Sequence, residues 1–166
     1  MQYIIAAAIA VVTALAEFTI VPYLQIGDAT LDATLVIAVI WAIAGGLEAG
    51  LTFAFVGGIA LDILGQRPLG STAFALLVAV GIASLVGGAL TRVRIVAPVI
   101  ATAVASPVYQ LLLLFSTTLL SIAPLSDAAL STVLPSTIYD TVVAAVVGPL
   151  AMTIVLRRQA QERMDW

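Results

Sequence analysis

Long apolar runs, separated by short stretches of Gly, Pro or charge, constrain this chain more than any other feature of its sequence. Only 9% of the 166 residues are charged and 63% are hydrophobic, whereas a soluble domain carries about 25% charged residues. A membrane helix needs roughly 20 apolar residues, so the length allows about six spans and no soluble domain. The runs also lack the period-two alternation of a membrane barrel. The sequence therefore predicts an all-α integral membrane protein, a single domain built as a six-transmembrane-helix bundle.

The spans can be placed from the residues that interrupt the apolar runs. The second predicted span is short for a hydrocarbon core about 30 Å thick, and only two glycines separate it from the third. We therefore expect a tight helical hairpin at that point. The six predicted spans are residues 2–23, 31–44, 47–64, 71–90, 95–120 and 134–156.

Arginine positions predict the orientation, because cytoplasmic loops are enriched in Lys and Arg. With six spans and the N-terminus inside, only Arg67 lies on the outer side. Both termini are therefore predicted to be cytoplasmic. The arginines that this topology places in the cytoplasm are Arg92, Arg94, Arg157, Arg158 and Arg163.

Small residues recur at four-residue spacing along three of the predicted helices. Such a ridge lets a neighbouring backbone come close, where van der Waals packing and weak Cα–H contacts hold helices together. The pattern favours packing inside the bundle, and a docking surface for another protein is the alternative. The third span carries Gly46, Gly50, Ala54 and Gly58, with Gly57 beside them. The first and fifth spans carry Ala6, Ala10 and Ala14, and Ala97, Ala101 and Ala105.

The stretch GGIALDILGQRPLG, residues 57–70, concentrates polar residues in an otherwise apolar region. Asp62 lies near the outer end of its helix, where an ionised carboxylate costs less than the roughly 2.5 to 3.5 kcal/mol of a helix centre. Its partner could be the Arg67 side chain, backbone N–H groups at the start of the fourth helix, or a bound cation or proton. A structural staple is favoured over translocation, because a relay normally shows several intramembrane acids in line.

The residues after Asp62 have the composition of a turn. Pro68 fits the second position and Gly70 the fourth position of a type I turn that starts at Arg67. Ser71 or Thr72 can then cap the following helix. Such a turn would bring the first N–H groups of that helix back toward the carboxylate. Asp62, Arg67, Pro68 and Gly70 are therefore candidates for a structural corner or a partner-facing surface.

Residues that carry out most enzyme chemistry are missing. The chain has no Cys and no His, which excludes thiol chemistry, imidazole bases and the usual Cys/His metal sites. Glu17 and Asp140 are acids within spans, and neither makes a relay by itself. The arginines form no nucleic-acid footprint. We expect no catalytic residue, metal or cofactor, and no binding of nucleic acid.

Three segments resemble the rod shape-determining protein MreD family. GGIALDILGQRPLGSTAFALL, residues 57–77, resembles its signature, in which a small-residue helix ends in an aspartate before a Pro-Leu-Gly turn and another helix. VPYLQIGDATLDATLVIAVIWAIAGG, residues 21–46, resembles its proline-bearing outer loop and second helix. VLPSTIYDTVVAAVVGPL, residues 133–150, resembles its last helix.

This resemblance implies a non-catalytic, multi-pass subunit of the bacterial inner membrane. Such a subunit works in the elongation (rod) complex and supports cell-shape control and peripheral peptidoglycan synthesis. Its implied partners are the membrane helix and periplasmic domain of MreC, then RodA and a class B penicillin-binding protein, with MreB reached indirectly. Membrane lipids surround it.

The substrate-binding S components of energy-coupling factor transporters are the alternative. They are similar in size and six-helix plan, the predicted bundle resembles their fold, and they dock through an alanine ridge matched by Ala6, Ala10 and Ala14. Such proteins need several polar or aromatic groups that converge on a vitamin from the outer side. The outer loops offer few such groups: Tyr23, Asp28, Asp32, Arg67, Asp127 and Tyr139. A small ion-coupled transporter is less favoured still.

Overall fold

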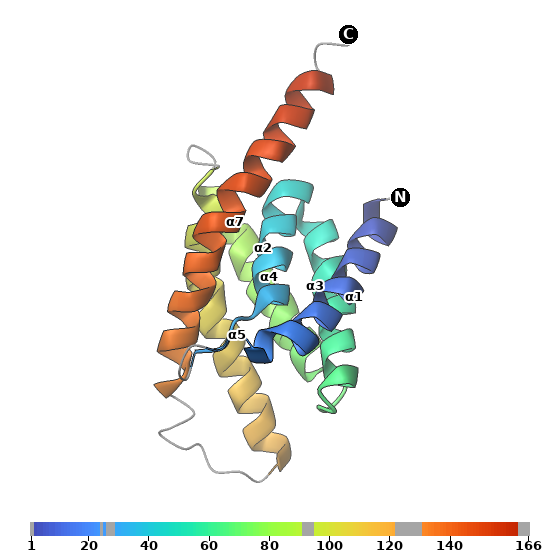
Figure 1. Cartoon of the computed structure of the whole chain (residues 1–166), viewed down its shortest axis with the longest axis vertical. Coiled ribbons are helices and arrows are strands. Elements are labelled where there is room, and N and C mark those ends of the chain that lie inside the picture. The colour runs from blue at the N-terminus through green and yellow to red at the C-terminus, as the bar shows by residue number, and fades with distance from the viewer. Residues whose placement is uncertain (1, 24, 26–28, 91–94, 122–130, 163–166) are drawn as a thin grey trace.

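Helices account for nearly all of the chain that the computed structural model describes, which is residues 2–23, 25, 29–90, 95–121 and 131–162 (Figure 1). No strand occurs within these ranges. Five helices are long and apolar enough to cross a membrane, and one apolar helix is shorter. The helices are α1 (Gln2–Ile20, followed by a 3₁₀ turn at Val21–Tyr23), α2 (Ala33–Gly45), α3 (Leu47–Leu64), α4 (Ser71–Ala89), α5 (Ala97–Ser121) and α7 (Val133–Glu162). The all-helical, multi-pass architecture predicted from the apolar runs is thus confirmed.

The predicted spans match these helices closely, with one clear difference at the C-terminal end. The span expected to end at residue 156 is part of α7, which continues to Glu162. The added residues include Arg, Gln, Ala and Glu, which favour helix even where they leave the apolar region. Several loop residues considered above lie outside the described part of the chain: Asp28, Arg92, Arg94, Asp127 and Arg163.

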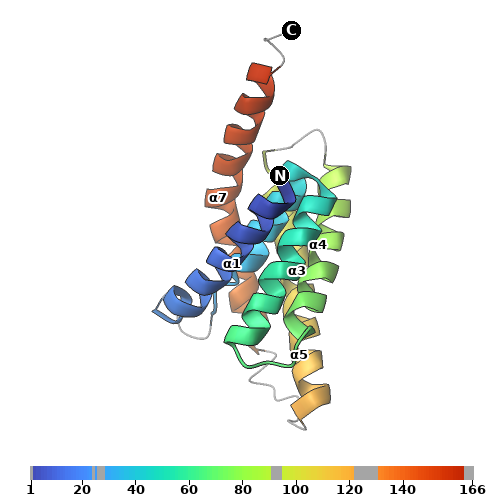
Figure 2. The ribbon, with the colours of Figure 1, turned by 90° about the vertical axis from the view of Figure 1, so that its right-hand side faces the viewer.

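The short helix α2 lies at the centre of the bundle. It contacts each of the five long helices, and seven of its 13 residues are buried, including Leu35, Val36 and Ile40. The long helices pack around it in neighbouring pairs, α1 with α3, α3 with α4, α4 with α5, and α5 with α7. Figure 2 shows α1 leaning away from the other helices toward its C-terminal end. The first residues of α1 and the last turns of α7 lie at the same end of the molecule (Figure 1).

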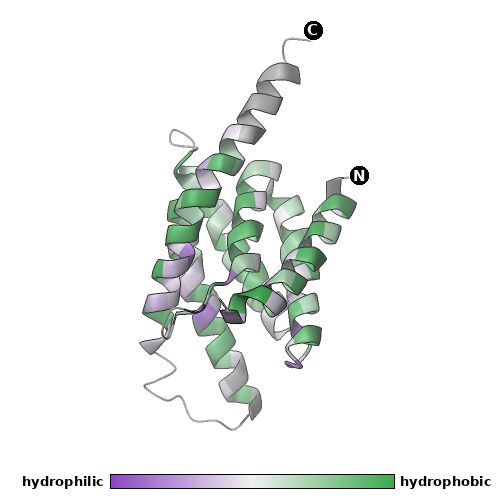
Figure 3. Cartoon of the chain, viewed as in Figure 1, coloured by the Kyte–Doolittle hydropathy of each residue, from purple (hydrophilic) through white to green (hydrophobic). Residues whose placement is uncertain are grey.

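The outside of the bundle is apolar. Each long helix exposes large hydrophobic side chains, for example Ile4, Phe55, Leu85, Phe115 and Val146. Most of the ribbon in Figure 3 is green, and the purple lies mainly in the half of the bundle away from the two termini. Lipid tails satisfy such a surface, whereas in water it would form a large exposed apolar area.

The hairpin between α2 and α3 depends on two glycines. Gly46 joins the helices with a φ of +95°, a conformation that glycine adopts without steric cost. One turn later, a Cβ added to Gly50 would lie 2.3 Å from the Cβ of Ala42 on α2. The two helices can therefore pack closely only because Gly50 has no side chain.

The rest of the small-residue ridge also lies inside the bundle. A Cβ on Gly58 would lie 2.3 Å from the Cα of Ala73 on α4, and one on Gly57 would lie 2.9 Å from Cγ2 of Thr34 on α2. Ala54 is fully buried. The alanine ridges of α1 and α5 are buried as well: Ala6, Ala10, Ala14, Ala97, Ala101 and Ala105. None of these residues presents a free face to a partner helix in this fold.

Gly58→Ala is expected to destabilise the bundle, because the new methyl group would meet the backbone of Ala73 rather than a movable side chain. Overpacking of this kind costs about 1 to 3 kcal/mol. Gly81→Ala is the matched control: it lies within α4, has nothing within 4 Å of an added Cβ, and gains up to about 1 kcal/mol of helix propensity. Thermal unfolding of the two variants in the same detergent measures the difference. Equal stability would show that α3 and α4 do not pack as described.

Candidate functional site

Four carboxylates gather toward one end of the bundle, although they come from four separate segments. Glu17 lies in α1, Asp32 directly precedes α2, Asp62 lies in the last turn of α3, and Asp140 lies in α7. Three of them accept hydrogen bonds from backbone N–H groups at the start of a helix on another segment. The unpaired N–H groups and the dipole of a helix start favour such a negative charge.

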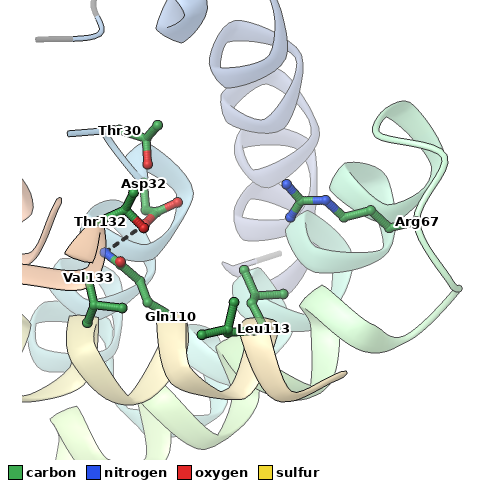
Figure 4. A pocket seen from close by; sticks show the side chains of 8 residues that line it. Thr30, Asp32, Arg67, Gln110, Leu113, Thr132 and Val133 are labelled. Carbon is green, nitrogen blue, oxygen red and sulfur yellow. Dashed lines mark hydrogen bonds between the residues drawn. The ribbon is translucent and has the colours of Figure 1, made fainter. Parts of the chain in front are cut away.

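Asp62 caps the start of α4. It is fully buried, and its Oδ2 accepts a hydrogen bond of 2.8 Å from the Gly70 N–H while its Oδ1 accepts one of 3.0 Å from the Thr72 N–H. The Ser71 hydroxyl adds a bond of 3.2 Å. Among the partners considered for Asp62, the structure therefore shows the helix start. The Arg67 side chain is directed elsewhere (Figure 4), and the backbone N–H of Arg67 donates to the main-chain oxygen of Asp62 at 3.0 Å.

The turn before α4 differs from the predicted one by a single residue. The Ser71 N–H donates to the carbonyl oxygen of Pro68 at 3.1 Å, so the turn runs from Pro68 to Ser71 rather than from Arg67 to Gly70. Gly70 occupies its third position with a φ of +94° and a ψ of −10°, which is typical of a type II turn. The prediction of type I was wrong because Gly70 provides the positive φ that only type II requires.

The start of α2 is capped in the same way by two other helices. The Asp32 N–H donates to Oδ1 of Asp140 at 2.9 Å, and the Thr34 N–H donates to Oε2 of Glu17 at 2.6 Å. These donors occupy the same positions as Gly70 and Thr72 in α4, namely the residue before the helix and its second residue. The caps tie α1 and α7 to the central helix.

Hydrogen bonds from α5 and α7 complete the support of the α2 start. The Ser106 hydroxyl donates to Oδ2 of Asp140 at 2.6 Å. The Thr30 N–H donates to the hydroxyl of Ser136 at 3.0 Å. Asp140 is fully buried, and every one of these groups contributes to holding one short segment, residues 30–34, in place.

Two adjoining cavities lie beside this segment, with volumes of about 260 Å³ and 390 Å³. They share Thr30, Asp32 and Arg67. Helix α2 has 13 residues against 18 in α3, so at 1.5 Å per residue it is about 7 Å shorter. The two cavities together, called the hollow below, lie beyond the start of α2. The smaller cavity is also lined by Gln110 and residues near it on α5 and α7, and the larger by Glu17, Phe18, Val21, Leu61 and Tyr109.

Asp32 and Arg67 face each other across this hollow. Figure 4 shows the Arg67 side chain extending from the α3–α4 connection toward the side where Asp32 and Gln110 lie. The Gln110 side chain donates to Oδ2 of Asp32 at 3.5 Å, a long and weak bond.

The other predicted candidates lie outside the cavity. Pro68 is exposed in the turn, and the glycine and alanine ridges pack between helices, as described above. Glu48, at the opposite end of α3, is exposed and accepts a hydrogen bond of 2.6 Å from the Tyr3 hydroxyl. Within the described residues, no group of three or more acids is close enough to hold a metal ion.

Sequence reasoning noted Glu17 and Asp140 as acids within spans but assigned them no role, and it did not single out Gln110 or Ser106. They are separated from residues 30–34 by up to 108 positions in the chain, so no local pattern connects them. The available signal was the presence of two acids within apolar spans and of a short helix whose own preceding residue, Asp32, provides no side-chain cap.

Asp62→Asn is expected to lower the stability of the protein, because an amide has one acceptor atom where the carboxylate now serves donors with both oxygens. Hydrogen bonds to charged groups contribute about 1.5 to 3 kcal/mol. The control is Glu48→Gln, which makes the same chemical change at an exposed acid and should alter stability by less than about 0.5 kcal/mol. Thermal unfolding in detergent distinguishes them, and similar midpoints would contradict the capping role.

Comparisons with models of known protein families, with curated proteins and with solved structures find no significant match to this chain. A functional proposal therefore depends on the sequence of the chain and on the geometry of its capped helix starts and polar cavity.

Proposed function

We propose that this chain is a non-catalytic, MreD-like subunit of the bacterial inner membrane that binds MreC in the elongation complex. RodA and a class B penicillin-binding protein would be its neighbours in that complex, and MreB would be reached indirectly. The observation that carries the proposal is the corner formed by Asp62, the Pro68–Ser71 turn and the start of α4. It is built from the residues in which the chain most resembles that family.

The corner has a buried side and an exposed side. Asp62 and Thr72 are fully buried and hold α3 against α4, whereas Leu69 is 75% exposed and Ile63 is 63% exposed. The arginine distribution predicts that this end of the bundle faces the outer side of the membrane. An exposed apolar tip at that level could contact MreC where its membrane helix passes into its periplasmic domain.

The buried ridges favour a particular mode of partner binding. Because the small residues of α1, α3 and α5 are used between helices, a partner's membrane helix would pack on the outer apolar faces instead. Exposed side chains on those faces and at the corner are therefore better candidates for recognition than the glycines themselves.

An S component is the second candidate function, and the polar cavity favours it. Glu17, Asp32, Arg67, Gln110 and Tyr109 converge there, which supplies ligand groups that the loops alone do not offer. The α1 ridge argues against it. Ala6, Ala10 and Ala14 are fully buried, whereas docking of a coupling subunit through that ridge would need them accessible.

Leu69→Ala is expected to reduce co-purification of MreC with this chain from membranes of its own bacterium, without lowering thermal stability. Leu85→Ala is the matched control, because Leu85 is 77% exposed and lies 14 positions after Ser71, about 21 Å along α4 from the corner. Equal recovery of MreC with both variants would contradict the proposed surface. Recovery of an ATPase and a coupling subunit in place of MreC would favour the S component.

A further inference from the structure

We infer that the two cavities form one binding site for a small zwitterionic group, with its cation at Asp32 and its anion at Arg67. This inference does not depend on the proposed role in the elongation complex. It identifies a ligand class by charge and size: a primary ammonium and a phosphate or carboxylate joined by a short linker. A free amino acid-like molecule and a phosphoethanolamine lipid headgroup both carry this chemistry.

Most carboxylates at this end of the bundle already have partners. Glu17, Asp62 and Asp140 each accept backbone N–H bonds of 2.6 to 3.0 Å from a helix start. Asp32 has no such role, since its side chain caps no helix. Among the described residues, only Gln110 contacts its carboxylate, at 3.5 Å. The fold therefore holds one carboxylate at the cavity beyond those needed for capping.

Arg67 is the matching charge of opposite sign. Its side chain lines both cavities and extends into the space that Asp32 faces (Figure 4). No ion pair within 4.0 Å joins it to Asp32 or Glu17, all three of which belong to the described part of the chain. The two opposite charges are thus held apart, Arg67 by the end of α3 and Asp32 by the start of α2, and the hollow lies between them.

The remaining lining suits a small polar molecule that has a short carbon skeleton. Thr30 and Gln110 add a hydroxyl and an amide beside Asp32. The larger cavity has an apolar wall that includes Phe18, Val21 and Leu61. The larger cavity, at about 390 Å³, is within the roughly 300 to 1,000 Å³ of small-molecule sites, which combine apolar walls with a few placed polar groups. A bound zwitterion would place a group of opposite charge beside each of the two side chains.

The experiment measures binding of defined probes to the full chain in detergent by calorimetry. We expect glycerophosphoethanolamine to bind, and ethanolamine and glycerol 3-phosphate, which carry one charge each, to bind at least tenfold more weakly. Glycerophosphocholine tests the ammonium: it should bind more weakly than glycerophosphoethanolamine, because its quaternary nitrogen cannot donate hydrogen bonds to Asp32. Native mass spectrometry with phosphatidylethanolamine against phosphatidylglycerol provides the lipid arm. Binding in the lipid arm alone would identify the headgroup as the source, and binding in both arms would identify the shared chemistry.

Asp32→Asn and Arg67→Gln should each weaken binding at least tenfold, because each removes a charge-assisted contact. Glu48→Gln makes the same acid-to-amide change at a distant exposed site and should bind as the wild type does. Arg67 is exposed in the turn region, so its variant should fold even if Asp32→Asn does not. Absence of binding by every zwitterion and lipid, or unchanged binding by Arg67→Gln, would overturn the inference. If the wild-type chain binds the zwitterion but does not co-purify with MreC, the proposed function is overturned and this inference is not.

Discussion

Carboxylates that cap helix starts from other helices are the interaction on which this structure depends. A bilayer offers no water to the first N–H groups of a helix, and an unsatisfied backbone group there costs several kcal/mol. Asp62 satisfies them for α4, and Asp140 and Glu17 satisfy them for α2. Each cap joins two elements that would otherwise be held only by non-directional apolar contacts. These three acids therefore lie at positions where a membrane bundle needs hydrogen-bond acceptors.

The shortness of α2 connects this capping to the cavity. Because α2 begins deeper in the bundle than its neighbours, its start must be capped from α1 and α7, and space remains beyond it. The same geometry places the Asp32 N–H beside Asp140 and the Thr34 N–H beside Glu17. One structural feature thus produces both the directional contacts and the hollow with opposite charges on its walls.

The two features with functional potential lie toward the same end of the bundle. The corner exposes an apolar tip at Leu69, and Arg67, two residues earlier, lines the cavity. A partner that bound the tip would therefore lie close to a residue of the ligand site. The small-residue ridges, in contrast, act within the bundle and give it the close helix contacts that replace the hydrophobic effect in lipid.

The sequence by itself determined the helices, because apolar length and Gly, Pro and charge at the boundaries are local properties. It also pointed to the helix start as one partner of Asp62, since Gly70 and Thr72 are only eight and ten residues away. Tertiary structure alone decided that the small-residue ridges pack between helices of the bundle. It also brought Glu17 and Asp140 to the start of α2. A carboxylate in a span has no sequence pattern that names its donor when 108 residues separate them. Only the packing of α1, α5 and α7 around a short central helix brings these acids to the start of α2, and the site forms there because α2 begins deeper in the bundle than its neighbours do.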